Sequence, residues 1–195
     1  MDIFYRLGQK LYVNITNKCP CACVFCIRDL TDSVGDAKSL WLTNEPTIEE
    51  ITTAFRSRTD LNQVTEIVFC GYGEPTERGE ILFETCKLIK HHPIRINTNG
   101  LARLINPNFN MRNLSAVNSI SVSLNADDAE EYMRLVNPRF GINSYQEVLD
   151  FAKAATEYTK VTLSVVQSHL SPERVERCKS IAAGLGLPLR IRTTV

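Results

Sequence analysis

Short apolar runs that resemble β-strands alternate along this chain with segments of helical periodicity. The runs are rich in β-branched residues and lie at positions 11–15, 66–70, 94–97, 120–124, 161–166 and 189–193. Apolar, β-branched composition is typical of buried strands. A repeated order of strand, helix and strand indicates a parallel sheet joined by right-handed crossovers. The sequence therefore predicts an α/β fold.

Several of these strands carry a polar residue at every second position. The alternating polar positions are Ser119, Ser121, Ser123, Thr162, Ser164, Arg190 and Arg192. Strands buried on both faces of a flat parallel sheet read as continuous apolar runs, so one polar face favours a curved sheet with a polar interior. A closed eightfold barrel typically needs about 250 residues, whereas this chain has 195. We expect a partial, open (βα)6 barrel that forms a single domain over residues 1–195.

Local signals predict where the helices begin. Capping-box spacings, with Thr or Ser followed three residues later by Glu, stand at 47–50 and 144–147. A further helix is expected over 77–90, and Ser171 followed by proline begins another. Residues 29–45 show little periodicity and predict a long loop, a kind of segment that is often functional.

The charge balance gives no sign of a polyanionic partner. Lys and Arg total 22, as do Asp and Glu, so the formal net charge is zero. This balance gives no support for a duplex nucleic acid or an anionic membrane as ligand. The longest apolar runs are too short to cross a bilayer, and the N-terminus lacks the basic-then-apolar order of a signal peptide. We expect a soluble, cytoplasmic protein that does not bind membranes.

Four of the seven cysteines are crowded together after the first predicted strand, at Cys19, Cys21, Cys23 and Cys26. Without an export signal, such a group favours a metal or redox site over disulfides. Cys19, Cys23 and Cys26 form a C-x3-C-x2-C pattern, and Cys21 is expected to be a bystander. Three thiolates on a four-iron cluster leave one iron open to a further ligand. A zinc site is the alternative, although zinc ribbons separate two C-x2-C pairs by a longer spacer.

This cysteine pattern, with Phe25 directly before its last cysteine, resembles that of the radical SAM superfamily. The resemblance implies that Cys19, Cys23 and Cys26 hold a [4Fe–4S] cluster whose open iron binds S-adenosylmethionine (SAM). It also implies that the reduced cluster cleaves SAM to a 5′-deoxyadenosyl radical, which abstracts hydrogen from a substrate.

Three further segments, each at the end of a predicted strand, resemble the SAM-binding motifs of this superfamily. Residues 71–75 read Gly-Tyr-Gly-Glu-Pro and resemble the G-G-E-P motif that meets the methionine amino group, with tyrosine at one glycine position. Residues 98–100 read Thr-Asn-Gly, and 123–125 resemble the segment that meets the carboxylate and ribose. Arg192, in the last strand, is expected to face the cofactor or the substrate. The cofactor-binding residues predicted in this way are Phe25, Tyr72, Gly73, Glu74, Asn99, Ser123, Asn125 and Arg192.

The start of the chain, with segments 12–17, 25–28, 39–42 and 45–47, resembles the TatD-family-associated radical SAM proteins, a name that implies no substrate. Few residues follow the last predicted strand, and a radical must be shielded from solvent while it reacts. We therefore expect an unknown bulky substrate, such as a protein or nucleic acid, or a partner protein, to complete the enclosure.

An electron donor such as flavodoxin or ferredoxin is also expected. No catalytic side chain is identified from the sequence. The alternative function is a non-enzymatic iron–sulfur or zinc protein that acts in electron transfer or sensing.

Overall fold

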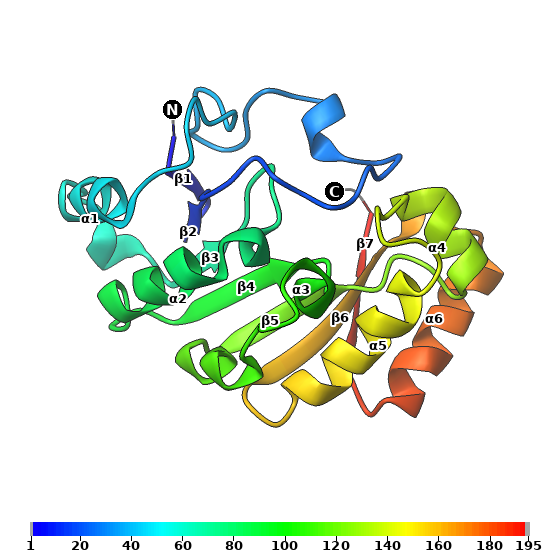
Figure 1. Cartoon of the computed structure of the whole chain (residues 1–195). Helices are drawn as coiled ribbons and strands as arrows, with labels where there is room; N and C mark the ends of the chain where they lie inside the picture. Colours follow the sequence, from blue (N-terminus) through cyan, green and yellow to red (C-terminus); the bar gives the residue numbers. More distant parts are fainter. Residues whose placement is uncertain (1, 194–195) are drawn as a thin grey trace.

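The computed structural model describes residues 2–193 and contains a seven-stranded sheet whose strands lie side by side in chain order (Figure 1). The strands are β1 (Phe4–Leu7), β2 (Lys10–Val13), β3 (Glu66–Phe69), β4 (Ile94–Thr98), β5 (Ser119–Ser123), β6 (Lys160–Val166) and β7 (Leu189–Arg192). Each neighbouring pair from β2 to β7 is parallel. The predicted α/β class and the six predicted strands are confirmed.

The strand β1 is an addition that the sequence analysis did not predict. It pairs with β2 in antiparallel orientation, with Leu7 opposite Lys10. Gly8, between them, has a φ of 61°, a left-handed conformation that suits a two-residue hairpin turn. The hairpin extends the expected six-stranded sheet by one antiparallel edge strand.

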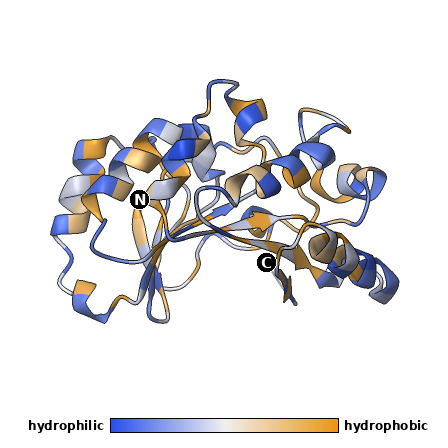
Figure 2. Ribbon diagram, turned by 90° about the horizontal axis from the view of Figure 1, so that it is seen from below, coloured by the Kyte–Doolittle hydropathy of each residue, from blue (hydrophilic) through white to orange (hydrophobic). Residues whose placement is uncertain are grey.

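Helices connect the parallel strands and cover the outer face of the sheet. They are α1 (Ile48–Arg56), α2 (Gly79–Leu88), α3 (Ala102–Ile105), α4 (Ala129–Val136), α5 (Ser144–Ala155) and α6 (Pro172–Gly184), with 3-10 turns η1 (Ile27–Asp29), η2 (Leu61–Gln63), η3 (Pro75–Arg78), η4 (Met111–Ala116) and η5 (Gln167–His169). Each longer helix carries both hydrophobic and hydrophilic residues (Figure 2). None of the described helices is long and apolar enough to span a bilayer.

The helix starts show which local signals decide a boundary. Thr47 and Glu50 make the predicted reciprocal capping box before α1. Ser171 caps α6, with proline at the first helical position as predicted. The predicted capping box at 144–147 is wrong, because Ser144 is itself the first residue of α5, its hydroxyl has no partner within residues 2–193, and Glu147 pairs with Arg103 instead.

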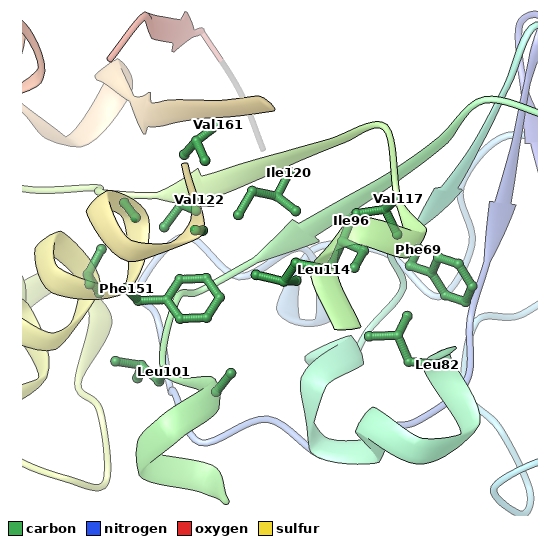
Figure 3. Close-up of a cluster of buried hydrophobic side chains, with 14 of the residues drawn as sticks. Phe69, Leu82, Ile96, Leu101, Leu114, Val117, Ile120, Val122, Phe151 and Val161 are labelled. Carbon is green, nitrogen blue, oxygen red and sulfur yellow. The ribbon is translucent and has the colours of Figure 1, made fainter. Parts of the chain in front are cut away.

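Buried apolar side chains fill the space between the sheet and its helices (Figure 3). The cluster includes Phe69, Leu82, Ile96, Leu101, Leu114, Val117, Ile120, Val122, Phe151 and Val161. These residues come from the apolar positions of the alternating strands and from the covering helices. The main core therefore lies on the outer face, and the polar positions of the alternating strands are left on the other face of the sheet.

The inner face is concave and polar. Residues from both edge strands, Tyr5 and Leu7 of β1 and Arg190 and Arg192 of β7, line one pocket together with residues of the central strands. Opposite edges can share a pocket only if the sheet curves around it. Among the described residues, β1 pairs only with β2 and β7 only with β6, so the barrel is open, as expected.

Candidate cofactor site

The cysteine-bearing segment between β2 and η1, here called the cluster loop (residues 14–26), crosses the end of the sheet toward α4 (Figure 1). Backbone hydrogen bonds run from the amides of Ala22 and Val24 to the carbonyls of Val136 and Leu135, at 3.1 and 2.9 Å. Cys21 forms a further β-bridge with Pro138. The end of α4 thus fixes the cluster loop at the rim of the barrel.

The four clustered cysteines fall into two environments. Cys19, Cys23 and Cys26 are partly exposed, whereas Cys21 is only 5% exposed and belongs to the buried core, against which Cys19 and Cys23 also pack. The side-chain amide of Asn99 donates to the Cys21 sulfur at 3.6 Å. Interaction with the Cys21 thiol lowers the pKa of Cys19, and the same contacts together with burial raise the pKa of Cys21. Cysteines bind metal as thiolates, so the lowered pKa favours Cys19 as a ligand, and the roles of the four cysteines stay predictions.

Arg28 is a site residue that the sequence analysis did not single out. Its guanidinium donates to the Cys26 sulfur at 3.4 Å and to the carbonyls of Asn17 and Cys21 at 3.3 and 3.4 Å. The positive charge of Arg28 also contributes to the lowered pKa of Cys19. The only sequence signal for Arg28 is its position two residues after Cys26, the last of the four clustered cysteines.

The segment 71–75 packs directly on the cluster loop. A Cβ atom at Gly73 would lie 2.3 Å from the Thr16 carbonyl oxygen and 2.6 Å from that of Lys18, so only glycine fits there. The Glu74 amide donates to the Lys18 carbonyl at 2.8 Å. This close approach fixes the predicted methionine-binding segment next to the cysteines.

The Glu74 carboxylate joins two of the predicted motifs. It is 4% exposed and accepts hydrogen bonds from the Thr98 hydroxyl and the Asn99 backbone amide, each at 2.7 Å. It also accepts from the Thr76 hydroxyl and backbone amide. Burial raises the pKa of Glu74, while these hydrogen bonds act in the opposite direction. The carboxylate therefore holds segments 71–75 and 98–100 together, and its contact with a methionine amino group stays a prediction.

Tyr72 packs into the loop 29–45. Its hydroxyl donates to the Thr31 carbonyl, and its ring packs edge-on against Trp41 with centroids 4.9 Å apart. With Tyr5 and Leu40 it forms a small buried cluster. The side chain thus anchors the loop, and any cofactor contact at this position falls to the backbone.

Two other predicted cofactor residues carry buried polar atoms without a partner within residues 2–193. Asn125 is 6% exposed, has a left-handed φ of 57°, and leaves its Oδ1 unbonded. Arg192 leaves its Nε unbonded, and burial lowers the pKa of its guanidinium. Unsatisfied buried polar atoms are rare in native proteins, so both residues fit a site that awaits a polar ligand.

Phe25 and Ser123 mark two sides of the same region. The Phe25 ring packs against His169 of η5, with centroids 5.4 Å apart. Ser123, at the end of β5, lines the pocket on the inner face. Phe25 thus ties the cluster loop to the segment that follows β6.

The pocket, here called the inner pocket, has a volume of about 470 Å³ and lies inside the curved sheet. Its wall includes Ile27, Val34 and Leu40, so the predicted long loop covers part of it. Serine, asparagine and arginine side chains of β4 to β7 line the opposite side. None of the four clustered cysteines lines it, so the pocket lies beside the cluster loop rather than within it.

The donor set consists of thiols. Across residues 2–193, no three His, Cys, Asp or Glu side chains are grouped so that one ion could be held. Thiolates that hold an iron–sulfur cluster bind different irons and need no common ion. Together with the orphaned Asn125 oxygen and the close approach at Gly73, the three partly exposed thiols suit a [4Fe–4S] cluster with SAM beside it.

Residues 13–179 match the family model of the radical SAM superfamily. The chain therefore belongs to this superfamily of enzymes, whose members use a [4Fe–4S] cluster and SAM. This confirms the predicted family, enzyme class and cofactors.

The chain is similar to individual proteins of known or assigned activity. It is 28% identical over 189 residues to a probable GTP 3′,8-cyclase of Methanocaldococcus jannaschii, covering 93% of this chain and 59% of that protein. SAM-bound SuiB of Streptococcus suis has a TM-score of 0.68 at 16% identity, over 95% of this chain and 39% of SuiB. TYW1 with a lysine–pyruvate adduct has a TM-score of 0.63 at 15% identity, over 96% of this chain and 66% of TYW1. This chain thus spans about three fifths of the length of the curated relative. The two solved structures share the fold of this chain.

Proposed function

We propose that this chain binds a [4Fe–4S] cluster through Cys19, Cys23 and Cys26 and acts on a substrate held in the inner pocket. In enzymes of this superfamily, reductive cleavage of SAM supplies a 5′-deoxyadenosyl radical that abstracts hydrogen from the substrate. The observation that most strongly supports this proposal is the difference in exposure among the cysteines: Cys19, Cys23 and Cys26 are partly exposed, and Cys21 is buried.

The chain's own groups divide the work of binding. The backbone at Gly73 approaches the cluster loop closely, and Glu74 holds that segment against Asn99. The free Oδ1 of Asn125 is an acceptor for a hydroxyl or ammonium of SAM. The loop 29–45, held by Tyr72 and Trp41, excludes water from the pocket beneath.

The substrate and partners extend this proposal. The inner pocket falls within the range of roughly 300–1,000 Å³ that is usual for small-molecule sites, so the reacting part of the substrate is of that size. A bulky remainder or a partner protein would close the open edge beside β7, as expected from the sequence. An electron donor such as flavodoxin or ferredoxin, membership of the TatD-associated subgroup and a cytoplasmic location remain predictions.

The alternative of a non-enzymatic electron carrier or sensor is not favoured. A carrier needs neither a pocket beside its cluster nor buried polar atoms awaiting a ligand. The zinc version of that alternative is further weakened by the absence, within residues 2–193, of three donors grouped around one ion.

The test is an anaerobic assay of reconstituted protein with SAM and dithionite, in which 5′-deoxyadenosine is measured. We expect slow formation without substrate by the wild type and by Cys21→Ala, and none by Cys23→Ala. A reconstituted wild type that contains a cluster but forms no 5′-deoxyadenosine would contradict the proposal.

A further inference from the structure

The inner pocket has an unbalanced charge. The three charged residues in its wall are all arginines, Arg95, Arg190 and Arg192, and no Asp or Glu lines it. Since the whole chain has no net charge, this concentration of positive charge is local. It lies on the inner face of strands β4 and β7.

Only one of these three cations is neutralised. The Arg95 guanidinium donates to both Glu66 oxygens, at 3.1 and 3.2 Å, and also to Asn97. No carboxylate within residues 2–193 lies at ion-pair distance from Arg190 or Arg192, although most arginines elsewhere on the sheet and helices have such a partner. The charged or ionisable groups that act on Arg192 are Cys70, Arg190 and Arg95.

Arg192 is directed into the pocket and lacks a partner there. It lines the pocket, and its buried Nε has no hydrogen-bond acceptor among residues 2–193. A partly buried guanidinium next to two other guanidinium groups is unfavourable unless an anion accompanies it. The guanidinium fork matches the geometry of a carboxylate or phosphate.

Neutral donors surround the same space. Ser121, Ser123 and Ser164 line the pocket from β5 and β6. Ser164 is paired with Arg190 across the strands, so a hydroxyl and a guanidinium lie side by side. Hydroxyl groups can donate to the oxygens that a guanidinium fork leaves free.

The pocket overlaps the predicted SAM site only at its margin. Of the eight predicted cofactor residues, Ser123 and Arg192 line it, and Glu74, Asn99 and Asn125 do not. The pocket instead extends to Tyr5 and Tyr12 of the N-terminal hairpin, whose rings stack with centroids 5.1 Å apart. Space for a second molecule therefore lies beside the cofactor.

We propose that Arg190 and Arg192 bind an oxyanion of the substrate, a phosphate ester or a carboxylate, inside the barrel. This inference rests on the proposed function and assigns Arg192 to the substrate rather than to SAM. It names the substrate class as a molecule whose reacting portion enters the pocket with its anionic group toward β7.

The test measures binding of two probes, inorganic pyrophosphate and citrate, to the reconstituted, SAM-loaded protein by isothermal titration calorimetry. The variants are Arg190→Gln, Arg192→Gln and the double variant, with exposed Arg56→Gln in α1 as the matched control. We expect the wild type and the control to bind at least one probe equally. The double variant should bind it at least ten times more weakly, with a loss at least ten times larger than any loss of SAM affinity. The preferred probe distinguishes a phosphate ester from a carboxylate.

Three results would overturn this inference: binding of neither probe at millimolar concentration, equal binding by wild type and the double variant, or a loss of SAM affinity as large as the loss of probe affinity. Arg190 is exposed, so its single variant keeps the test valid if Arg192→Gln unfolds. The proposed function fails separately, when the wild type binds a probe but forms no 5′-deoxyadenosine.

Discussion

The two faces of the sheet are made from the same strands but differ in chemistry. In β6, Val161, Leu163 and Val165 face the helices and are buried in the core, whereas Ser164 lines the inner pocket. Successive side chains of a strand point to opposite faces. Stability and function are therefore assigned to alternate residues, and substitutions on the two faces should have separable effects.

The cluster loop differs from the strands, because both kinds of cysteine lie together in it. Cys19, Cys21 and Cys23 are two residues apart, and the Cys21 thiol interacts with the thiols of the other two. Cys21 is nevertheless 5% exposed, while Cys19 and Cys23 are partly exposed. Depth of burial, rather than alternation along the chain, therefore distinguishes the predicted bystander from the predicted ligands.

The largest expected effect breaks the comparison at the cluster loop. Replacing Cys19, Cys23 or Cys26 by Ala should abolish cluster binding, because three thiolates are the complete protein donor set of the predicted cluster. Cys21→Ala is the matched control and should retain about four irons per chain after anaerobic reconstitution. Iron analysis and the visible absorbance spectrum measure both. A full cluster in Cys23→Ala together with its loss in Cys21→Ala would reverse the assignment.

A second prediction compares the two faces by stability. Phe151, on α5, is fully buried against the outer face, and truncation to Ala should cost about 3–5 kcal/mol of unfolding free energy. The Ser121 hydroxyl, on the inner face, makes no hydrogen bond within residues 2–193, and Ser121→Ala should change stability by less than about 0.5 kcal/mol. Urea unfolding of the apoprotein measures both. Equal losses would mean that the inner face also carries packing energy.

Local patterns and contiguous motifs made much of this arrangement predictable. The six parallel strands follow from their β-branched runs, and the polar inner face follows from the alternation in β5, β6 and β7. The cluster loop and segment 71–75 are each one continuous stretch of sequence, so their residues could be named before their spatial relation was known. That relation depends on backbone contacts, such as that of Gly73 with Thr16, which no pattern encodes.

What the sequence analysis missed has physical reasons. The strand β1 is four residues long and too short to show periodicity. Helix α4 was missed although Asp128 caps it and Glu131 follows three residues later. The inner pocket gathers residues from β1 to β7, so its unbalanced charge exists only after folding.

A third, smaller effect concerns SAM affinity. Asn125→Ala removes the unbonded Oδ1, and a hydrogen bond to a charged group contributes roughly 1.5–3 kcal/mol, so SAM should bind at least about ten-fold more weakly while the cluster is retained. Asn137→Ala is the control, since Asn137 also has a positive φ, 43°, but is exposed at the end of α4. Equilibrium dialysis with labelled SAM measures the difference. The same loss in both variants would point to backbone strain rather than to a lost ligand contact.

The smallest expected effect compares arginines on the two sides of the molecule. Unlike Arg190 and Arg192, Arg6 and Arg58 share a carboxylate, with Asp60 at 3.1 and 2.7 Å. These cations lower the pKa of Asp60 from its usual 3.8 to about 2. A carboxyl whose pKa is lower in the folded than in the unfolded state contributes stability above pH 3.8, and that contribution is lost as the pH falls toward 2. Because the pair is partly exposed, the contribution is about 1 kcal/mol or less.

Asp60→Asn should therefore lower the melting temperature slightly at pH 6 and show a smaller further decrease than the wild type between pH 4 and pH 2.5. If the melting temperatures of both proteins depended on pH in the same way, the interaction of Asp60 with its two arginines would contribute nothing to stability.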